Sequence, residues 1–448
     1  MTFNPHTVQD REEMLAAIGV ASIDDLFSVI PADIRNPDLH QPPSLTEMEA
    51  AARMSELAAK NMSIAPGDSF LGAGSYSHYV PALVNQLLMR GELFTAYTPY
   101  QPEVAQGTLQ IIYEFQSMVA ALLGTEVANA SLYDGATAMA EAALMALAVS
   151  KNRHRLVVSP TVHPHYRQVM MTYLSGRDVH VDTLPFGGEA DLRLTSDSVT
   201  ACVDDSTAAV IVQYPNFYGE IEDIAAFADS VHAAGALLIV VTLPVPLGLL
   251  KSPGELGADI VTAEGQSLGV AQSFGGPYVG LLGARQSFVR QMPGRIAGVA
   301  SDTEGKRGFV LTLQTREQHI RRDKATSNIC TNQGLMATAA TVYMSALGPK
   351  GFEEVAERCW QNAHHLADRI GALPGFTVVT AGDFFHEFVV TSDQEPAEIN
   401  RRLAQTGIIG GLDLGRFEPA LAKHMLFCAT ELNDQAAIDR LITALSAI

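Results

Sequence analysis

The sequence predicts an α/β protein that has a large, mostly parallel sheet and a smaller C-terminal α+β domain. Three observations carry this prediction. Continuous runs of Val, Ile and Leu recur between residues 156 and 282, and segments with helical spacing separate them. Such runs are typical of parallel strands that helices cover on both faces. The chain has 448 residues, too many for one simple core, and the part after residue 350 mixes helical segments with a few strands.

The composition excludes several classes of protein. Hydrophobic residues make up 47%, which is enough to offset chain entropy and excludes a disordered chain. The 29 Lys and Arg against 49 Asp and Glu give a net charge of −20, so we expect no nucleic acid and no membrane surface as partner. The sequence shows no secretory signal and no apolar run long enough to span a bilayer. We therefore expect a cytoplasmic protein.

The four cysteines lie far apart and form no CxxC pair, so neither a zinc site nor a disulfide framework is predicted. His163-Pro-His165 could suggest a metal pair, but no third ligand accompanies it at useful spacing. We predict no metal.

Residues 1–60 are predicted to form an N-terminal arm of short helices. One amphipathic helix covers residues 7–18, and Ser22 begins a second with acidic residues in its first turn. Ser44 and Glu47 have the spacing of a capping box that opens a third helix.

The large α/β domain is predicted over residues 61–310. A long helix at 107–123 and an Ala-rich helix up to 149 precede the regular alternation of strands and helices. The strands are expected at 156–159, 179–184, 208–214, 237–243, 260–263 and 279–282, with helices near 165–174, 221–234 and 284–292.

Residues 311–349 hold an Arg-rich segment followed by a long connecting helix. Residues 350–448 form the predicted small domain. Its elements are expected as helices at 351–370, 396–406 and 434–448 and strands at 376–380, 387–391 and 424–428.

One element suits a phosphate group. Asp134-Gly-Ala-Thr137 opens a helix with a glycine and a hydroxyl side chain, so free N–H groups and the positive end of the helix dipole are available. Taken alone, the four residues fit an ordinary helix start with Asp134 as N-cap. His163 follows the next strand, where its ring could cover a planar cofactor. This plan is similar to the aspartate-aminotransferase-like enzymes that use pyridoxal phosphate.

The two chemical requirements of such a site are missing. The strand at 237–243 should end in an acid for the pyridine nitrogen, but it ends Val-Val-Thr-Leu-Pro. A Schiff-base lysine should follow the strand at 260–263, but the chain reads Glu264-Gly-Gln-Ser-Leu-Gly269. None of the seven lysines is well placed: Lys60, Lys151, Lys251, Lys306, Lys324, Lys350 and Lys423.

Longer motifs then resemble one family. Thr98-Pro-Tyr-Gln-Pro-Glu103 with Gln106-Gly107 is similar to a hallmark of glycine decarboxylase, the P protein of the glycine cleavage system. Further matching segments span nearly the whole chain: Asn129-Ala-Ser131, Glu264 to Gly269, Gly275-Gly-Pro277, Arg307-Gly-Phe309 and residues 313–331.

The resemblance implies a divided enzyme. P proteins are one long chain of two homologous halves or separate α and β subunits, and pyridoxal phosphate belongs to the second half or β subunit. This chain is similar to the first half and so looks like an α subunit, with no cofactor bound covalently to it. The family decarboxylates glycine and transfers the aminomethyl group to the lipoyl arm of the H protein. The expected partners are a β subunit and lipoylated H protein, in an α2β2 assembly.

Site residues follow from the same resemblance. In this superfamily, active sites lie at subunit interfaces, and we expect the irregular segment with Tyr97, Thr98, Tyr100 and Gln101 to reach the partner's cofactor or substrate. A tight loop that packs on its own domain is the alternative.

Two further groups of residues are candidates for the partner's active site: Ser75 and His78, and Arg316 and Arg321. The arginines fit a solvated salt-bridge cluster at least as well. Asp134, Gly135, Thr137 and His163 are interpreted as the remnant of an ancestral cofactor pocket.

Two other functions stay open at this point. The chain could be a self-sufficient pyridoxal phosphate enzyme that uses an unusual lysine, such as Lys251 or Lys324. It could also be a scaffold or regulatory subunit without catalysis.

Overall fold

The computed structural model describes residues 5–150, 152–185 and 192–448. The chain divides into two compact units, residues 1–62 and residues 63–448, which are treated separately here. No helix among the described residues is long and apolar enough to cross a membrane.

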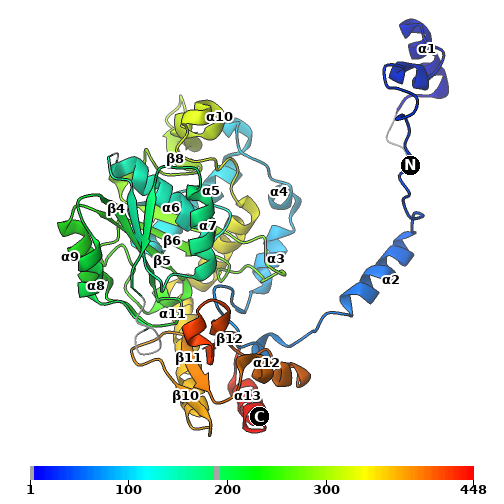
Figure 1. The fold of residues 1–448 in the computed structure, drawn as a ribbon. Coiled ribbons are helices and arrows are strands. Elements are labelled where there is room, and N and C mark those ends of the chain that lie inside the picture. Colours follow the sequence, from blue (N-terminus) through cyan, green and yellow to red (C-terminus); the bar gives the residue numbers. More distant parts are fainter. Residues whose placement is uncertain (1–4, 151, 186–191) are drawn as a thin grey trace. The chain divides into compact units, whose positions relative to one another are not determined.

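The N-terminal unit consists of short helices. They are α1 (Val8–Ile18), the 3-10 helix η1 (Ile23–Phe27) and α2 (Glu47–Ala58) (Figure 1). Ser22 caps η1, as the sequence predicts. None of residues 5–62 is buried, so these helices lack the apolar packing that normally stabilises short helices in proteins.

The predicted position of the N-cap of α2 is wrong by two residues. Thr46, not Ser44, caps the helix, and its side chain accepts from the N–H of Glu49 while the Glu49 carboxylate accepts from the N–H of Thr46. Both pairs have the same spacing in the sequence, and the pair closer to the helical residues satisfies the free N–H groups.

The larger unit is built on a seven-stranded sheet with the order β1-β7-β6-β5-β4-β2-β3. β3, β2, β4, β5 and β6 are parallel, and β7 is antiparallel to both of its neighbours. The strands are β1 (Val127–Ala128), β2 (Arg155–Val158), β3 (His180–Thr183), β4 (Thr207–Tyr214), β5 (Leu237–Thr242), β6 (Ile260–Glu264) and β7 (Gly280–Ala284). The predicted α/β class is confirmed.

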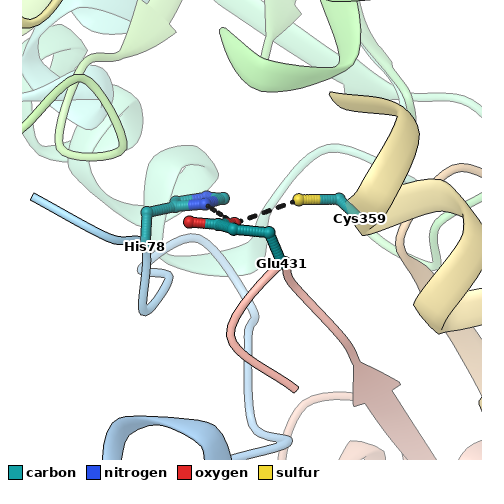
Figure 2. Close-up of side chains that lie close together, drawn as sticks. All are labelled: His78, Cys359 and Glu431. Atoms are coloured by element: carbon teal, nitrogen blue, oxygen red, sulfur yellow. Dashed lines mark hydrogen bonds and ion pairs between the residues drawn. The ribbon is translucent and has the colours of Figure 1, made fainter. Parts of the chain in front are cut away.

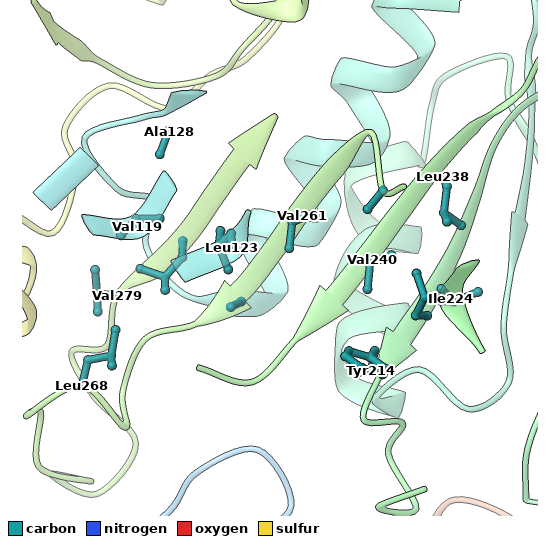
Figure 3. Close-up of a cluster of buried hydrophobic side chains, with 14 of the residues drawn as sticks. Val119, Leu123, Ala128, Tyr214, Ile224, Leu238, Val240, Val261, Leu268 and Val279 are labelled. Carbon is teal, nitrogen blue, oxygen red and sulfur yellow. The ribbon is translucent and has the colours of Figure 1, made fainter. Parts of the chain in front are cut away.

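Both faces of this sheet are covered, which explains the continuous apolar runs. On one face Leu238 and Val240 pack in a cluster with residues of α5 (Gln106–Leu123) and α9 (Ile224–Ala233), as Figure 3 shows. On the other face Ile239 and Val241 pack with α6 (Gly135–Ser150) and α7 (Pro164–Leu174). Consecutive residues of β5 therefore point into two different parts of the core.

A long helix leads to the C-terminal part of the chain. α11 (Gly334–Gly371) is interrupted at Gly348, whose φ of 61° is non-helical and which precedes Pro349. A four-stranded antiparallel sheet follows, with the order β10-β11-β13-β12. Its elements are β10 (Phe376–Val378), β11 (Glu387–Ser392), α12 (Pro396–Gln405), β12 (Leu412–Asp413), β13 (His424–Cys428) and α13 (Gln435–Ser446).

The chain between β7 and α10 differs from the prediction in two places. The helix expected at 284–292 is only the 3-10 turn η6 (Gln286–Phe288), since the chain must turn toward β8. β8 (Ile296–Ser301) and β9 (Arg307–Thr312) form an antiparallel hairpin that the sequence did not predict, because glycines and charged residues interrupt its apolar pattern. Among the described residues, the remaining short helices are η2 (Pro66–Asp68), α3 (Ala82–Leu88), α4 (Gly91–Phe94), η3 (Pro102–Val104), α8 (Ser196–Cys202), η5 (Val245–Gly248), η7 (Gln314–Arg316), α10 (Gln318–Arg321), η8 (Arg322–Lys324), η9 (Leu414–Arg416) and η10 (Pro419–Leu421).

Candidate functional site

The N-terminus of α6 lies where the sequence suggests a phosphate cup. Asp134 Oδ1 accepts from the N–H of Thr137 at 2.7 Å and from its hydroxyl at 2.8 Å, as an N-cap does. The N–H of Gly135 donates to Glu264 Oε2 at 2.8 Å. The carboxyl group of Glu264 therefore takes the place at this helix end that an external anion would occupy.

Glu264 is deeply buried at the end of β6. Its other oxygen, Oε1, accepts from the N–H groups of Gln266 at 3.0 Å and of Val279 at 3.3 Å. Burial raises the pKa of Glu264 to about 8, and the backbone N–H donors oppose that rise. The fit is close, because a Cβ on Gly135 would lie 2.9 Å from the backbone nitrogen of Glu264. The side chain of Glu264 therefore occupies the space next to this helix end.

Both ring nitrogens of His163 and one face of its ring also contact groups of the same chain. The ring of Tyr166 stacks on it with 4.7 Å between centroids, and Nε2 lies 3.0 Å from the carbonyl of Ala73. Nδ1 accepts from the N–H of His165. Burial lowers the pKa of His163 to about 4. The ring is thus neutral with its proton on Nε2, and one of its two faces stacks on Tyr166.

These contacts decide whether pyridoxal phosphate fits this chain. The phosphate position meets the Glu264 carboxylate, and Tyr166 stacks on the ring that should cover the cofactor. β5 ends in Thr242, whose hydroxyl donates to the carbonyl of Tyr214, and supplies no acid. The residues directly after β6, Gly265 to Gly269, include no lysine. The residues present do not fit the cofactor.

The segment of residues 97–101 has a different character. It is irregular and lies between α4 and η3, and the side chains of Tyr97 and Tyr100 are 78% and 51% exposed. A buried arginine holds it. Arg295 Nη1 donates to Thr98 Oγ1 at 3.3 Å, and Nη2 donates to the Tyr100 hydroxyl at 3.1 Å.

Arg295 is 2% exposed and lies immediately before β8. Its Nε lies 3.5 Å from Glu317 Oε2, and the guanidinium carbon lies 5.3 Å from the centre of the Tyr100 ring. Glu317 is also buried, with its side chain 6% exposed. A buried ion pair therefore lies beneath the exposed segment.

Other motif residues converge on the same region. The Gln106 amide donates to the carbonyl of Phe309 and accepts from its N–H, at 2.8 and 2.9 Å. Asn332 donates to the carbonyl of Ala130 at 2.8 Å and to the Ser131 hydroxyl at 3.1 Å. A cavity of about 260 Å³ lies between residues 93–99, the first half of α5 and the start of α11. Motifs that are far apart in the sequence thus build one site.

The two predicted arginines have different environments. Arg316 is half-buried, and its guanidinium donates to the carbonyls of Leu313, Met292 and Gly294. Arg321 is exposed at the end of α10. Arg316 therefore ties the chain before β8 to η7, while Arg321 faces outward.

Ser75 and His78 belong to another cluster. The Ser75 hydroxyl lies 2.8 Å from that of Tyr278, and His78 Nδ1 lies 2.7 Å from Glu431 Oε2. Cys359 of α11 donates to the same oxygen, as Figure 2 shows. Among the described residues, no hydrogen bond or ion pair joins Ser75 or His78 to residues 97–101.

His78, Cys359 and Glu431 offer ligand atoms that lie within 4.8 Å of one another. The 2.7 Å between Nδ1 and Oε2 is, however, a hydrogen-bond length. Burial alone would raise the pKa of Glu431, but its hydrogen bond and charge interaction with His78 hold that pKa below its usual value. These contacts tie residues 75–79 to α11 and to the segment after β13.

The fold defines the class: an α/β chain of the aspartate-aminotransferase type, with the Glu264 carboxyl group at the N-terminus of α6. Comparison with known proteins agrees. The model of the glycine cleavage system P-protein family matches residues 1–445. The chain belongs to this family.

Its relatives cover the chain from end to end. It is 56% identical over 445 residues to a probable glycine dehydrogenase (decarboxylating) subunit 1 of Thermomicrobium roseum, with 99% of both chains covered. A crystal structure of glycine decarboxylase (P-protein) in inhibitor-bound form is 43% identical, with a TM-score of 0.91 and all of both chains covered. Oryza sativa TDC, solved with PLP, is 12% identical with a TM-score of 0.67 over 100% of this chain and 99% of its own, and shares the fold.

Arg295 and Glu317 were not predicted from the sequence. Glu264 was noted only because it opens the segment in which the expected lysine is missing. A single arginine before the apolar residues of β8 was the only available signal for Arg295. The other two depend on contacts with segments far away in the sequence.

Proposed function

We propose that this chain is the α subunit of glycine decarboxylase, an oxidoreductase subunit that has no cofactor of its own and completes an active site on a second, homologous chain. The names of its relatives support the enzyme class. The observation that carries the division of labour is Glu264, which fills the anion position at the start of α6.

In this proposal the β subunit holds pyridoxal phosphate, which supplies the electron sink for glycine decarboxylation. The α subunit contributes residues 97–101. Tyr97 and Tyr100 are exposed at the surface, and the Tyr100 hydroxyl accepts a hydrogen bond from the buried Arg295. Lipoylated H protein would receive the aminomethyl group, and two αβ pairs would form α2β2.

Exposed apolar side chains support the need for a partner. In the N-terminal unit Val8, Val29 and Ile34 are 68%, 89% and 63% exposed. Apolar surface of this kind commonly marks a protein–protein contact. We expect the β subunit to cover part of it.

The test is co-expression with a β-type chain that has a lysine after its equivalent of β6. Glycine-dependent release of carbon dioxide, with H protein present, should need both chains, and each chain alone should be inactive. Full activity of the β chain alone would instead support the scaffold function.

The self-sufficient enzyme is tested by incubating this chain alone with pyridoxal phosphate and borohydride. Lys251 and Lys324 are both exposed, and neither stands directly after β6. We expect no stoichiometric pyridoxyl-lysine, and one such adduct at a unique position would contradict the proposed function.

A further inference from the structure

The buried guanidinium of Arg295 hydrogen-bonds to side chains of the segment 97–101. Within the described residues, every side-chain hydrogen bond of this segment comes from Arg295, which bonds both Thr98 and Tyr100. The segment forms no helix or strand. Pro99 is buried and anchors the segment by packing, so Arg295 is its one side-chain hydrogen-bonding tie among the described residues.

Burying a charge is unfavourable unless it is paired, so the burial of Arg295 requires an explanation. Glu317 supplies the opposite charge at 3.5 Å, yet Arg295 Nε and Glu317 Oε1 lack hydrogen-bond partners within the described structure. A pair formed for stability alone would satisfy these atoms. The two hydrogen bonds of the guanidinium, at 3.3 and 3.1 Å, run instead to Thr98 and Tyr100 of the segment.

The shape of the group suits this task. A guanidinium is planar and carries donors in a fixed fork, so it fixes the Thr98 and Tyr100 hydroxyls relative to one another. The Tyr100 ring lies 5.3 Å from the guanidinium carbon, close enough for a cation–π contact. A lysine has one flexible ammonium group and cannot reproduce both bonds in this geometry.

The geometry points to Arg295 as the positioning residue of the active site that α and β subunits share. It orients Thr98 and Tyr100 toward the partner's cofactor or substrate, and Glu317 holds Arg295 in register. This inference rests on the proposed function, because it assigns a support to the segment that the function places in the active site.

The test uses the assembled αβ complex with R295K in the α chain. R285K is the matched control, since Arg285 also pairs with a buried carboxylate, Asp259 at 3.0 Å, without contacting residues 97–101. We expect R295K to lower kcat/KM for glycine at least about tenfold, and R285K to stay within about twofold.

A double-mutant cycle separates positioning from a general loss of structure. In a T98V/Y100F background, the same R295K change should cost less than about twofold, because the hydroxyls on which it acts are gone. An equal loss of activity in both backgrounds would overturn the inference. If R295K destabilises the complex, E317Q replaces it in the same cycle, with a smaller loss that is again absent from the T98V/Y100F background.

The outcomes also separate the inference from the proposed function. If T98V/Y100F lowers activity but R295K does not, Arg295 is not a positioning residue and the role of the segment stands. If T98V/Y100F has full activity, both the segment's role and the inference fail. If the wild-type αβ complex does not decarboxylate glycine, the proposed function fails.

Discussion

The internal carboxylate of Glu264 makes stability depend on pH in a predictable direction. Burial raises its pKa from 4.5 to about 8 in the folded chain. Between these two pH values the folded state keeps a proton that the unfolded state loses. Each unit of increase in pH therefore lowers the free energy of unfolding by about 1.4 kcal/mol. Stability is fully present below the unfolded pKa and is lost as the pH rises through the folded value.

The perturbation is E264Q, which is neutral at every pH. From about pH 6 to about pH 8, the wild type should lose about 2 kcal/mol relative to the variant, because the folded carboxyl is half ionised at the upper value. The amide of the variant would face the Gly135 N–H, which adds an offset that is the same at both pH values. Other buried acids with raised pKa, such as Glu222 and Glu387, cancel in this difference.

The assay is urea unfolding of both proteins at the two pH values. The single tryptophan, Trp360, is 42% exposed and reports unfolding by fluorescence, with circular dichroism as a second probe. A wild type that gains stability relative to E264Q as the pH rises would refute the reasoning. In that event the three N–H donors would outweigh the cost of burying the charge.

Other predictions follow from packing. Gly219→Ala should lower the free energy of unfolding by at least about 3 kcal/mol in urea unfolding, because φ is +91° and its Cβ would lie 1.9 Å from the carbonyl oxygen of Glu387. Gly176→Ala, with φ +80° and open space around it, should cost only about 1 to 2 kcal/mol, and equal losses at both glycines would contradict the steric argument. Leu123→Ala in the core of the sheet should lower the thermal midpoint, with a cost of about 3 kcal/mol, and an unchanged midpoint would place Leu123 outside the core. Removing residues 1–62 should change the free energy of unfolding of the remainder by no more than about 0.5 kcal/mol, since none of residues 5–62 is buried, but should weaken capture of the β chain in pull-down assays.

The strands of the large sheet were predictable because their signal is local. β5 is buried on both faces, so its six residues are all apolar or β-branched and stand out in the sequence. The break at Gly348 is also local, since a glycine and a proline separate the two helical segments. By contrast, β1 has only two residues, and the β8–β9 hairpin has a mixed pattern, so neither carries a periodic signal.

The sequence identifies which expected residues are missing from the site more readily than which residues contact one another there. Missing residues at the ends of β5 and β6 can be identified directly in the sequence, and that this chain forms no Schiff base stays a prediction. The contacts of Glu264 with Gly135 and of Arg295 with Thr98 join residues 129 and 197 positions apart. Nothing in the local pattern of either pair indicates its partner. The role of residues 97–101 stays a prediction.

The closed pocket also bears on the evolutionary history of the chain. A lysine introduced after β6 would meet a helix end already occupied by Glu264 and a histidine ring already covered by Tyr166. No single substitution would restore cofactor binding, because the lysine, the acid at the end of β5 and the cleared anion position are each useless without the others. Under the proposed function, a stepwise return of the cofactor to this chain would therefore pass through variants that gain nothing, and the chain would stay dependent on its partner.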